Sequence, residues 1–205
     1  MQRFFVDEKN ITADRVKIVG DDVKHISNSL RLSSGEEIIV VPKTGDTGIE
    51  YLVELVTIKR EKIIGAVIEE REIATEAPVD IHLAQAVPKK KNMELVVQKA
   101  TELGVSKIIS LQTERTVVKL SGKKAQKRIA RWQRIANAAA KQSQRGLIPE
   151  VCGLYNPGEL LNKGAKKERY DLILFCYTGG KGTDIKNILK SFLKNKLVKD
   201  SEYNR

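Results

Sequence analysis

The sequence predicts two segments of different class: an all-β segment, residues 1–72, and an α/β segment, residues 73–205. In the first, short apolar runs separated by Gly and Asp turn signals recur at regular spacing, which is typical of a small β-barrel. After Pro78 the pattern changes to strands that alternate with helices, which indicates a parallel sheet covered by helices. Residues 69–78 hold few apolar side chains and end in that proline, so we place the domain boundary there.

Length and composition exclude several classes of protein. A chain of 205 residues suffices for one or two domains with real cores. No apolar run approaches the roughly 20 residues that cross a bilayer, and charge appears too early for a secretory signal. Cys152 and Cys176 lack metal spacing and are interpreted as thiols in a reducing compartment. His25 and His82 have no partner ligands nearby. We therefore expect a cytoplasmic protein without a membrane span or a metal site.

Charge is distributed unevenly along the chain. Residues 1–72 contain 11 Lys or Arg and 14 Asp or Glu, net −3, whereas residues 73–205 contain 26 and 12, net +14. Lys and Arg displace counterions from phosphates, so this asymmetry favours RNA or DNA as the partner of the second segment. A merely solubilising surface is the alternative.

The elements of the first segment follow from apolar runs. One helical pattern, residues 22–32, interrupts the strands and places Val23, Ile26 and Leu30 on one face, with Asp21 or Asp22 as its cap. The predicted strands are residues 4–6, 16–19, 38–41, 51–56 and 63–68.

The elements of the second segment alternate. Asn92 is predicted to cap the first helix and Gly104 to end it. The run 171–177 is apolar throughout, which predicts a strand buried on both faces. The predicted strands are residues 79–87, 107–111, 150–152 and 171–177, and the predicted helices are residues 92–104, 122–143, 156–161 and 184–193.

The long helix, residues 122–143, has two contrasting sides. An apolar stripe at helical spacing faces one way, and cations follow the same rhythm on nearly the opposite side. Between Lys119 and Pro149 there are nine Lys or Arg and no acidic residue. Because a solvated face usually mixes signs, we predict phosphate contact. The stripe is Ala125, Ile129, Trp132, Ala136 and Ala139, and the cations are Lys127, Arg131, Arg134, Lys141 and Arg145.

Ligands of open parallel sheets bind beyond the carboxyl ends of the strands. Three loops are expected at that edge: residues 88–91, 113–121 and 178–182. The second places Glu114 and Arg115 beside threonine hydroxyls, as part of a polar site or as a local ion pair. The third is not a phosphate-binding loop, because Gly182 follows Lys181 where Ser or Thr is required. Composition and spacing alone therefore indicate no reaction.

Several segments resemble the RsmE family, bacterial methyltransferases that modify N3 of a uridine in 16S ribosomal RNA. Each match alone is weak, but their order and spacing together are specific, and they cover nearly the whole chain. The matching segments are Met1–Val6, His25–Gly35, Met93–Gly104, Thr113–Leu120 and Arg131–Val151.

The resemblance implies a fold and a cofactor. Residues 1 to about 72 would be a PUA-like barrel that binds RNA, and residues 73–205 a SPOUT methyltransferase domain. Family members continue beyond the position of Arg205 with a glycine-rich turn and a further strand and helix. The domain is therefore expected to be incomplete, with the trefoil knot and most of the S-adenosylmethionine pocket C-terminal to Arg205. Homodimerisation is implied for the complete chain.

The resemblance also implies site residues. Arg115 and Glu114 are the catalytic candidates, with Thr113 and Ser143 at the pocket rim, although Ser143 could equally be a helix-end hydroxyl. A non-catalytic RNA-binding module is the alternative function. The candidate contacts to 16S ribosomal RNA or the small ribosomal subunit are Arg3, Arg31, Lys89, Lys127, Arg131, Arg134, Lys141 and Arg145.

Overall fold

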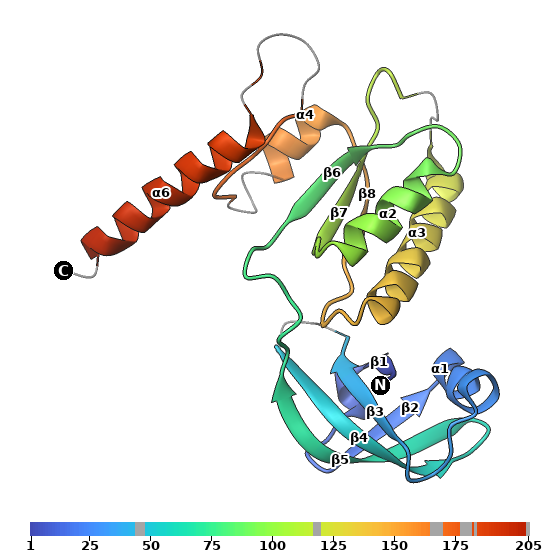
Figure 1. The fold of residues 1–205 in the computed structure, drawn as a ribbon. Coiled ribbons are helices and arrows are strands. Elements are labelled where there is room, and N and C mark those ends of the chain that lie inside the picture. Colours follow the sequence, from blue (N-terminus) through green and yellow to red (C-terminus); the bar gives the residue numbers. More distant parts are fainter. Residues whose placement is uncertain (44–47, 117–119, 165–169, 177–181, 183, 204–205) are drawn as a thin grey trace. The chain divides into compact units, whose positions relative to one another are not determined.

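The computed structural model describes residues 1–43, 48–116, 120–164, 170–176, 182 and 184–203. The backbone divides into two compact units, Met1–Pro157 and Gly158–Arg205 (Figure 1). In the described ranges, no helix combines the length and the apolar character that a membrane span needs. The first unit contains both an N-terminal curled sheet and a parallel sheet, so the predicted boundary near residue 72 falls inside it.

The curled sheet has five strands in the order β1-β3-β4-β5-β2. Strand β1 pairs with β3 in parallel, and the other pairs are antiparallel. Inward side chains such as Val16, Ile18 and Ile38 form one hydrophobic core. All five predicted strands are confirmed. Their bounds are β1 Arg3–Val6, β2 Arg15–Val19, β3 Glu37–Pro42, β4 Ile49–Ile58 and β5 Lys62–Glu72.

Residues 69–78, the predicted domain boundary, begin as part of a strand. Strand β5 continues through Glu72 and stays paired with β4, so residues 69–72 belong to the curled sheet. Their side chains are exposed, which is why the sequence pattern of polar residues hid the strand. The predicted helix 22–32 is present as α1, Asp21–Lys24, followed by a π-helical turn, His25–Leu30.

The parallel sheet has three strands, β6 His82–Ala86, β7 Lys107–Leu111 and β8 Glu150–Tyr155, in that order. Helices α2, Asn92–Glu102, and α3, Gly122–Gln142, connect the strands and lie side by side (Figure 1). Their inner side chains form a second core with the sheet. It includes Met93, Val97, Ile108, Trp132 and Ala136.

Both helices end in the same way. The amide of Val105 donates to Ala100 O, and the amide of Gly104, at φ +100°, donates to Thr101 O. At the end of α3, the amides of Arg145 and Gln144 donate to Ala140 O and Lys141 O. These are Schellman ends, with Gln144 taking the left-handed conformation at φ 55° where glycine is usual. At the start of α2, Asn92 is the first helical residue rather than the cap, and Lys91 precedes it.

The two sheets are joined within the first unit. Phe5, Ile39, Val41 and Leu52 of the curled sheet pack around Ala140 of α3. A Cβ at Gly146 would lie 2.3 Å from Ile73 Cγ2, so only glycine allows this close approach. The curled sheet and α3 therefore share a third, small hydrophobic core.

The second unit contains most of α4, Pro157–Glu159, then a π-helical turn, Leu160–Gly164, and α6, Ile185–Tyr203. The predicted strand at residues 171–177 is wrong over its described part. Residues 171–176 form no ladder, and Ile173, Leu174 and Phe175 are 56%, 40% and 83% exposed. An apolar run supplies surface to bury but no hydrogen-bond partner, and the described part of this unit contains no other strand. Of the predicted loop 178–182, residues 178–181 lie outside the described residues.

Candidate nucleic-acid interface

The carboxyl ends of the three parallel strands lie at one edge of the sheet, hereafter the carboxyl edge. Ala86, Leu111 and Tyr155 are in register there. The amides of Val87 and Gln112 extend the ladder by one bond each, to Leu111 O at 3.0 Å and Tyr155 O at 2.8 Å. The connections before α2 and α3 therefore both begin at this edge, as predicted from strand–helix alternation.

The connection between β7 and α3 is held by its own side chains. Gln112 Oε1 accepts the Leu120 amide at 2.9 Å. Thr116 Oγ1 accepts the Thr113 amide at 2.9 Å, and the two threonine hydroxyls lie 2.9 Å apart. This turn leaves Glu114 and Arg115 exposed. The two residues do not pair with each other, and neither has an ion-pair partner within the described segments. Residues 117–119 of this loop lie outside those segments.

Helix α3 has a buried apolar side and an exposed cationic side, as its sequence predicts. Trp132 and Ala136 are fully buried against the sheet, whereas Lys127, Arg131 and Arg134 are exposed. Arg131 Nη2 lies 3.0 Å from Glu94 Oε2 of α2, yet its side chain stays 52% exposed. We call the outward cations of α3 the cationic face. Its members are Lys123, Lys124, Lys127, Arg131 and Arg134.

Most of the cationic face is electrostatically uncompensated. Arg131 has Glu94 as a partner, but no ion pair joins Lys123, Lys124, Lys127 or Arg134 to another residue of the described ranges. Since α3 begins beside the carboxyl edge, Lys123 and Lys124 lie near that edge. The exposed Lys89, Lys90 and Lys91 precede α2 at the same edge.

Arg145 corrects the expectation that it continues the cationic face. It lies three residues beyond the last residue of α3 and is only 4% exposed. Its Nη1 donates to Thr101 O at 3.1 Å and Val105 O at 2.6 Å, and its Nε and Nη2 bind Glu76. The Schellman end turns the chain inward at Gln144, so the helical rhythm no longer applies.

Arg3 and Lys141 each bind an acidic side chain of the protein. Arg3 is 8% exposed, with Nη2 at 2.6 Å from Glu50 and Nη1 donating to Arg145 O at 3.2 Å. Lys141 Nζ lies 2.6 Å from Asp22 Oδ1 and 5.6 Å from the centre of the Phe4 ring. Arg3 thus joins the curled sheet to the loop after α3, and its burial corrects its prediction as an RNA contact. Lys141 joins α3 to α1 and keeps a side chain that is 30% exposed, so its RNA contact stays a prediction.

Ser143 was predicted as a pocket-rim residue or, alternatively, as a helix-end hydroxyl, and the structure shows the second role. Its Oγ donates to Ala139 O at 2.7 Å. Thr113 precedes α3 at the carboxyl edge, and Ser143 follows α3 at its other end, about 30 Å away along a helix of this length. The two predicted rim residues are therefore not brought together. Of the other candidates, Lys89 and Arg31 are exposed, Lys89 at the carboxyl edge and Arg31 on the curled-sheet side.

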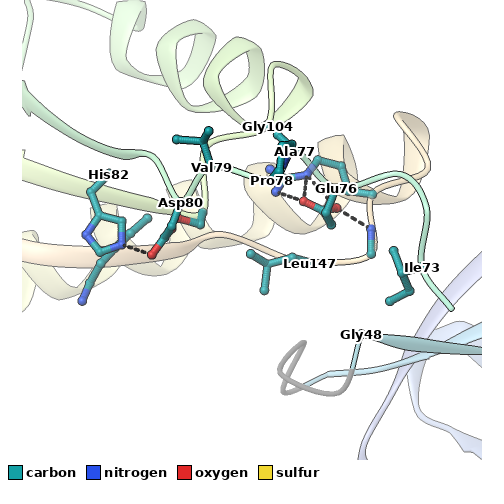
Figure 2. A pocket seen from close by; sticks show the side chains of 14 residues that line it. Gly48, Ile73, Glu76, Ala77, Pro78, Val79, Asp80, His82, Gly104 and Leu147 are labelled. Atoms are coloured by element: carbon teal, nitrogen blue, oxygen red, sulfur yellow. Dashed lines mark hydrogen bonds and ion pairs between the residues drawn. The ribbon is translucent and has the colours of Figure 1, made fainter. Parts of the chain in front are cut away.

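A cavity of about 610 Å³ lies at the opposite, amino end of the parallel sheet (Figure 2). Sequence reasoning missed it, because its walls come from the connection before β6 and the loop before β8. Its polar groups bind one another: Glu76 with Arg145, and Asp80 with His82 at 3.3 Å. Ser106 Oγ also donates to Asp80. This mutual pairing makes the cavity wall structural.

The ionisation of Glu76 reflects that pairing. Burial alone would raise its pKa, but the hydrogen bonds and charge of Arg145, with the amides of Gly146 and Leu147, outweigh burial and lower the pKa. Glu76 is therefore ionised at neutral pH and holds the loop at residues 145–147. Across the described ranges, no three His, Cys, Asp or Glu side chains are grouped as metal ligands would be.

Comparison with known proteins gives one consistent family. A family model described as "RNA methyltransferase domain" matches residues 75–199. Ribosomal RNA small subunit methyltransferase E of Bacillus subtilis (strain 168) is 36% identical over 166 residues, which cover 80% of this chain and 64% of the relative. Its counterpart in Mesomycoplasma hyopneumoniae (strain 232) is 33% identical over 183 residues, 85% of this chain and 71% of the relative.

A solved structure gives the same result. The ribosomal RNA small subunit methyltransferase E of Neisseria gonorrhoeae, bound to S-adenosyl methionine, superposes with a TM-score of 0.70 at 31% identity. That match covers 80% of this chain and 66% of the solved chain. The chain thus spans slightly less than two thirds of the length of the Bacillus and Neisseria proteins.

Proposed function

We infer that this chain, which belongs to the RsmE family of RNA methyltransferases, binds small-subunit ribosomal RNA and takes part in its methylation. The observation that carries this inference is the cationic face of α3. Its exposed charges have one sign, and most of them are left without a partner by the described part of the protein. Such charges favour a polyanion, because binding releases the counterions condensed on its phosphates.

The carboxyl edge is the proposed place for the target nucleotide. Lys89 and Arg115 are exposed there, and the first turns of the cationic face adjoin it. We assign to Arg115 a phosphate contact close to the target uridine, and to Glu114 and Thr113 the shaping of the rim. Methylation at uridine N3 requires loss of the N3 proton and a fixed position of the base. These side chains contribute the positioning.

S-adenosylmethionine is the proposed cofactor and methyl donor, by analogy with the Neisseria structure. Three polar side chains of the carboxyl edge are already engaged within the chain. The hydroxyls of Thr113 and Thr116 bond each other, and Gln112 Oε1 is taken by the Leu120 amide. We therefore assign Gln112, Thr113 and Thr116 no role in binding the cofactor.

We propose that residues 1–72 form a PUA-like barrel and residues 73–205 a SPOUT-type domain, with the five-stranded curled sheet and the parallel sheet as their cores. A homodimer and a trefoil knot are proposed for the protein by the same family argument. The proposed site of action is the cytoplasm, where ribosomal RNA is assembled into subunits.

Sedimentation with purified ribosomal subunits tests the proposed function. We expect the chain to pellet with small subunits and the variant Lys127→Glu/Arg134→Glu to remain in the supernatant. Equal pelleting with large subunits would reduce the interaction to unspecific polyanion binding and overturn the assignment. The same mixture supplied with S-adenosylmethionine tests the reaction. N3-methyluridine in the recovered RNA would establish it, whereas specific binding without methyluridine would leave this chain an RNA-binding role only.

A further inference from the structure

Lys141 lies where helical spacing would continue the cationic face of α3. Lys127, Arg134 and Lys141 follow one another at intervals of seven residues. Seven residues are close to two helical turns, so the three side chains leave the same side of α3, about 10 Å apart along its axis. Lys127 and Arg134 are exposed and form no ion pair within the described ranges, whereas Lys141 is paired. The row of cations therefore ends in one that already has an anionic partner.

That partner is Asp22 of α1. Asp22 Oδ1 lies 2.6 Å from Lys141 Nζ, and the ammonium group also lies 5.6 Å from the centre of the Phe4 ring. An ammonium group has three donors and no acceptor, so it binds a carboxylate and a phosphate in the same way. Asp22 thus takes the place at Lys141 that a phosphate of RNA would take.

The ion pair between Asp22 and Lys141 is open to exchange. The two side chains are 22% and 30% exposed, so water screens the charges and the pair contributes less to stability than a buried one. The ammonium group is carried on a flexible four-carbon stem and can turn toward another anion. Arg145 differs, because it is 4% exposed and donates to two carbonyls at the end of α2. Lys141 is therefore accessible to RNA, and Arg145 is not.

Arg131 also has an acidic partner, but it can bind RNA without losing it. Its Nη2 lies 3.0 Å from Glu94 Oε2, and its side chain is 52% exposed. A guanidinium group has five N–H donors, so the remaining donors can bind a phosphate while Glu94 stays in place. Of these two acidic partners, Asp22 is therefore the one that RNA has to displace.

We propose that Asp22 competes with RNA for Lys141 and thereby limits the affinity of α3 for RNA. This inference rests on the proposed function. RNA that contacts only the cationic face leaves the ion pair intact. RNA that continues past Arg134 toward α1 has to displace Asp22, whose carboxylate then repels the neighbouring phosphates. The pair therefore lowers the affinity for RNA that extends beyond the cationic face.

Fluorescence anisotropy with a labelled small-subunit ribosomal RNA fragment, over a range of KCl concentrations, tests this proposal. Asp22→Asn keeps the shape of the side chain and removes its charge. We expect this variant to bind about three- to tenfold more tightly at low salt, because Lys141 becomes free for one more phosphate. The slope of log K against log [KCl] should steepen by about 1 for the same reason. Asp22→Glu keeps a carboxylate and should bind like the wild-type chain.

Two further variants test whether the gain comes from Lys141. Asp21→Asn removes the neighbouring exposed carboxylate of α1 and is the charge control, which should leave the slope nearly unchanged. In Asp22→Asn/Lys141→Ala the gain should disappear, because the freed cation is absent. An equal gain in Asp21→Asn, or a gain that persists in the double variant, would reduce the effect to general charge and overturn the proposal.

Unchanged affinity and slope in Asp22→Asn would overturn it as well. Urea unfolding of the same variant should remain cooperative, because the pair is partly exposed. Loss of cooperative unfolding would show that the pair is needed for the fold and cannot be exchanged, which would also contradict the proposal. Failure of the proposed function is distinguishable, because the wild-type chain would then show no salt-dependent binding of RNA. Failure of this inference alone would leave that binding intact.

Discussion

Arg145 and Glu76 are 69 residues apart in the sequence and form a bidentate ion pair in the structure. Arg145 Nη2 lies 2.5 Å from Glu76 Oε2, and Arg145 Nε lies 3.1 Å from Glu76 Oε1. The same guanidinium donates to two carbonyls at the end of α2. One side chain thus fixes the end of α2, the loop after α3 and the connection before β6.

Replacing Arg145 should destabilise the protein strongly. Arg145→Met leaves the Glu76 carboxylate and two carbonyls without their donor, so we expect the free energy of unfolding to fall by about 3 kcal/mol or more. Arg145→Lys keeps the charge but cannot serve both carbonyls and the carboxylate, so its loss should be intermediate. Urea denaturation followed by circular dichroism measures both. A loss under about 1 kcal/mol for Arg145→Met would show that the pair contributes little.

The same pair predicts a pH dependence. Because the pKa of Glu76 is lower in the folded protein than in the unfolded chain, its contribution to stability is present above the unfolded pKa. That contribution is lost as the pH falls through the folded pKa. Glu76→Gln should therefore lose stability at neutral pH and show a flatter decline on acidification. Parallel curves of unfolding free energy against pH for the two proteins would contradict this assignment.

Arg145 also shows where sequence periodicity ceases to predict position. Lys127, Arg131 and Arg134 share the rhythm of α3 and are exposed as expected. Arg145 has the same helical spacing in the sequence. The helix, however, ends at Gln142, and Gln144 in the left-handed conformation changes the direction of the chain. Its partner Glu76 lies in a connection without any periodic pattern. Helical spacing applies only while the helix continues, and a long-range ion pair leaves no local signal.

Trp132 anchors α3 on the parallel sheet. Its side chain is fully buried among Met93, Val97 and Ile108. Trp132→Ala should lower the free energy of unfolding by about 3–5 kcal/mol, through lost burial and the remaining cavity. Trp132→Phe fills part of the space and should lose less. Chemical denaturation monitored by circular dichroism separates the two, and equal losses below about 1 kcal/mol would place the tryptophan outside the core.

Arg115 should matter for RNA and not for folding. It is exposed on the turn closed by Thr113 and Thr116, so Arg115→Ala should change the free energy of unfolding by no more than about 0.5 kcal/mol. Affinity for small-subunit RNA should fall several-fold with the loss of one phosphate contact. Lys17→Ala, which removes one exposed cation from β2, is the matched control and should not weaken binding. Unchanged affinity in Arg115→Ala would remove this residue from the interface.

The fold was more predictable than the partner of each side chain. The strand at residues 107–111 and the start of α3 at Gly122 were predicted correctly from the pattern of strands that alternate with helices. The run 171–176 failed, because apolar composition cannot report whether a neighbouring strand exists to pair with it. The prediction that Arg3 contacts RNA failed for a related reason. Sequence shows that a cation is present, but Arg3 is buried beside Glu50, which lies far away in the chain.

The central claim is that the cationic face of α3 binds ribosomal RNA. Its most direct test is the salt dependence of affinity for a small-subunit RNA fragment, measured for Lys123→Ala/Lys127→Ala/Arg134→Ala. The matched control, Lys17→Ala/Lys24→Ala/Lys62→Ala, removes the same charge from exposed positions of the curled-sheet side. We predict that the slope of log K against log [KCl] falls by about 2 to 3 for the α3 variant and changes little for the control. An unchanged slope for the α3 variant, or an equal decrease in the control, would contradict the claim.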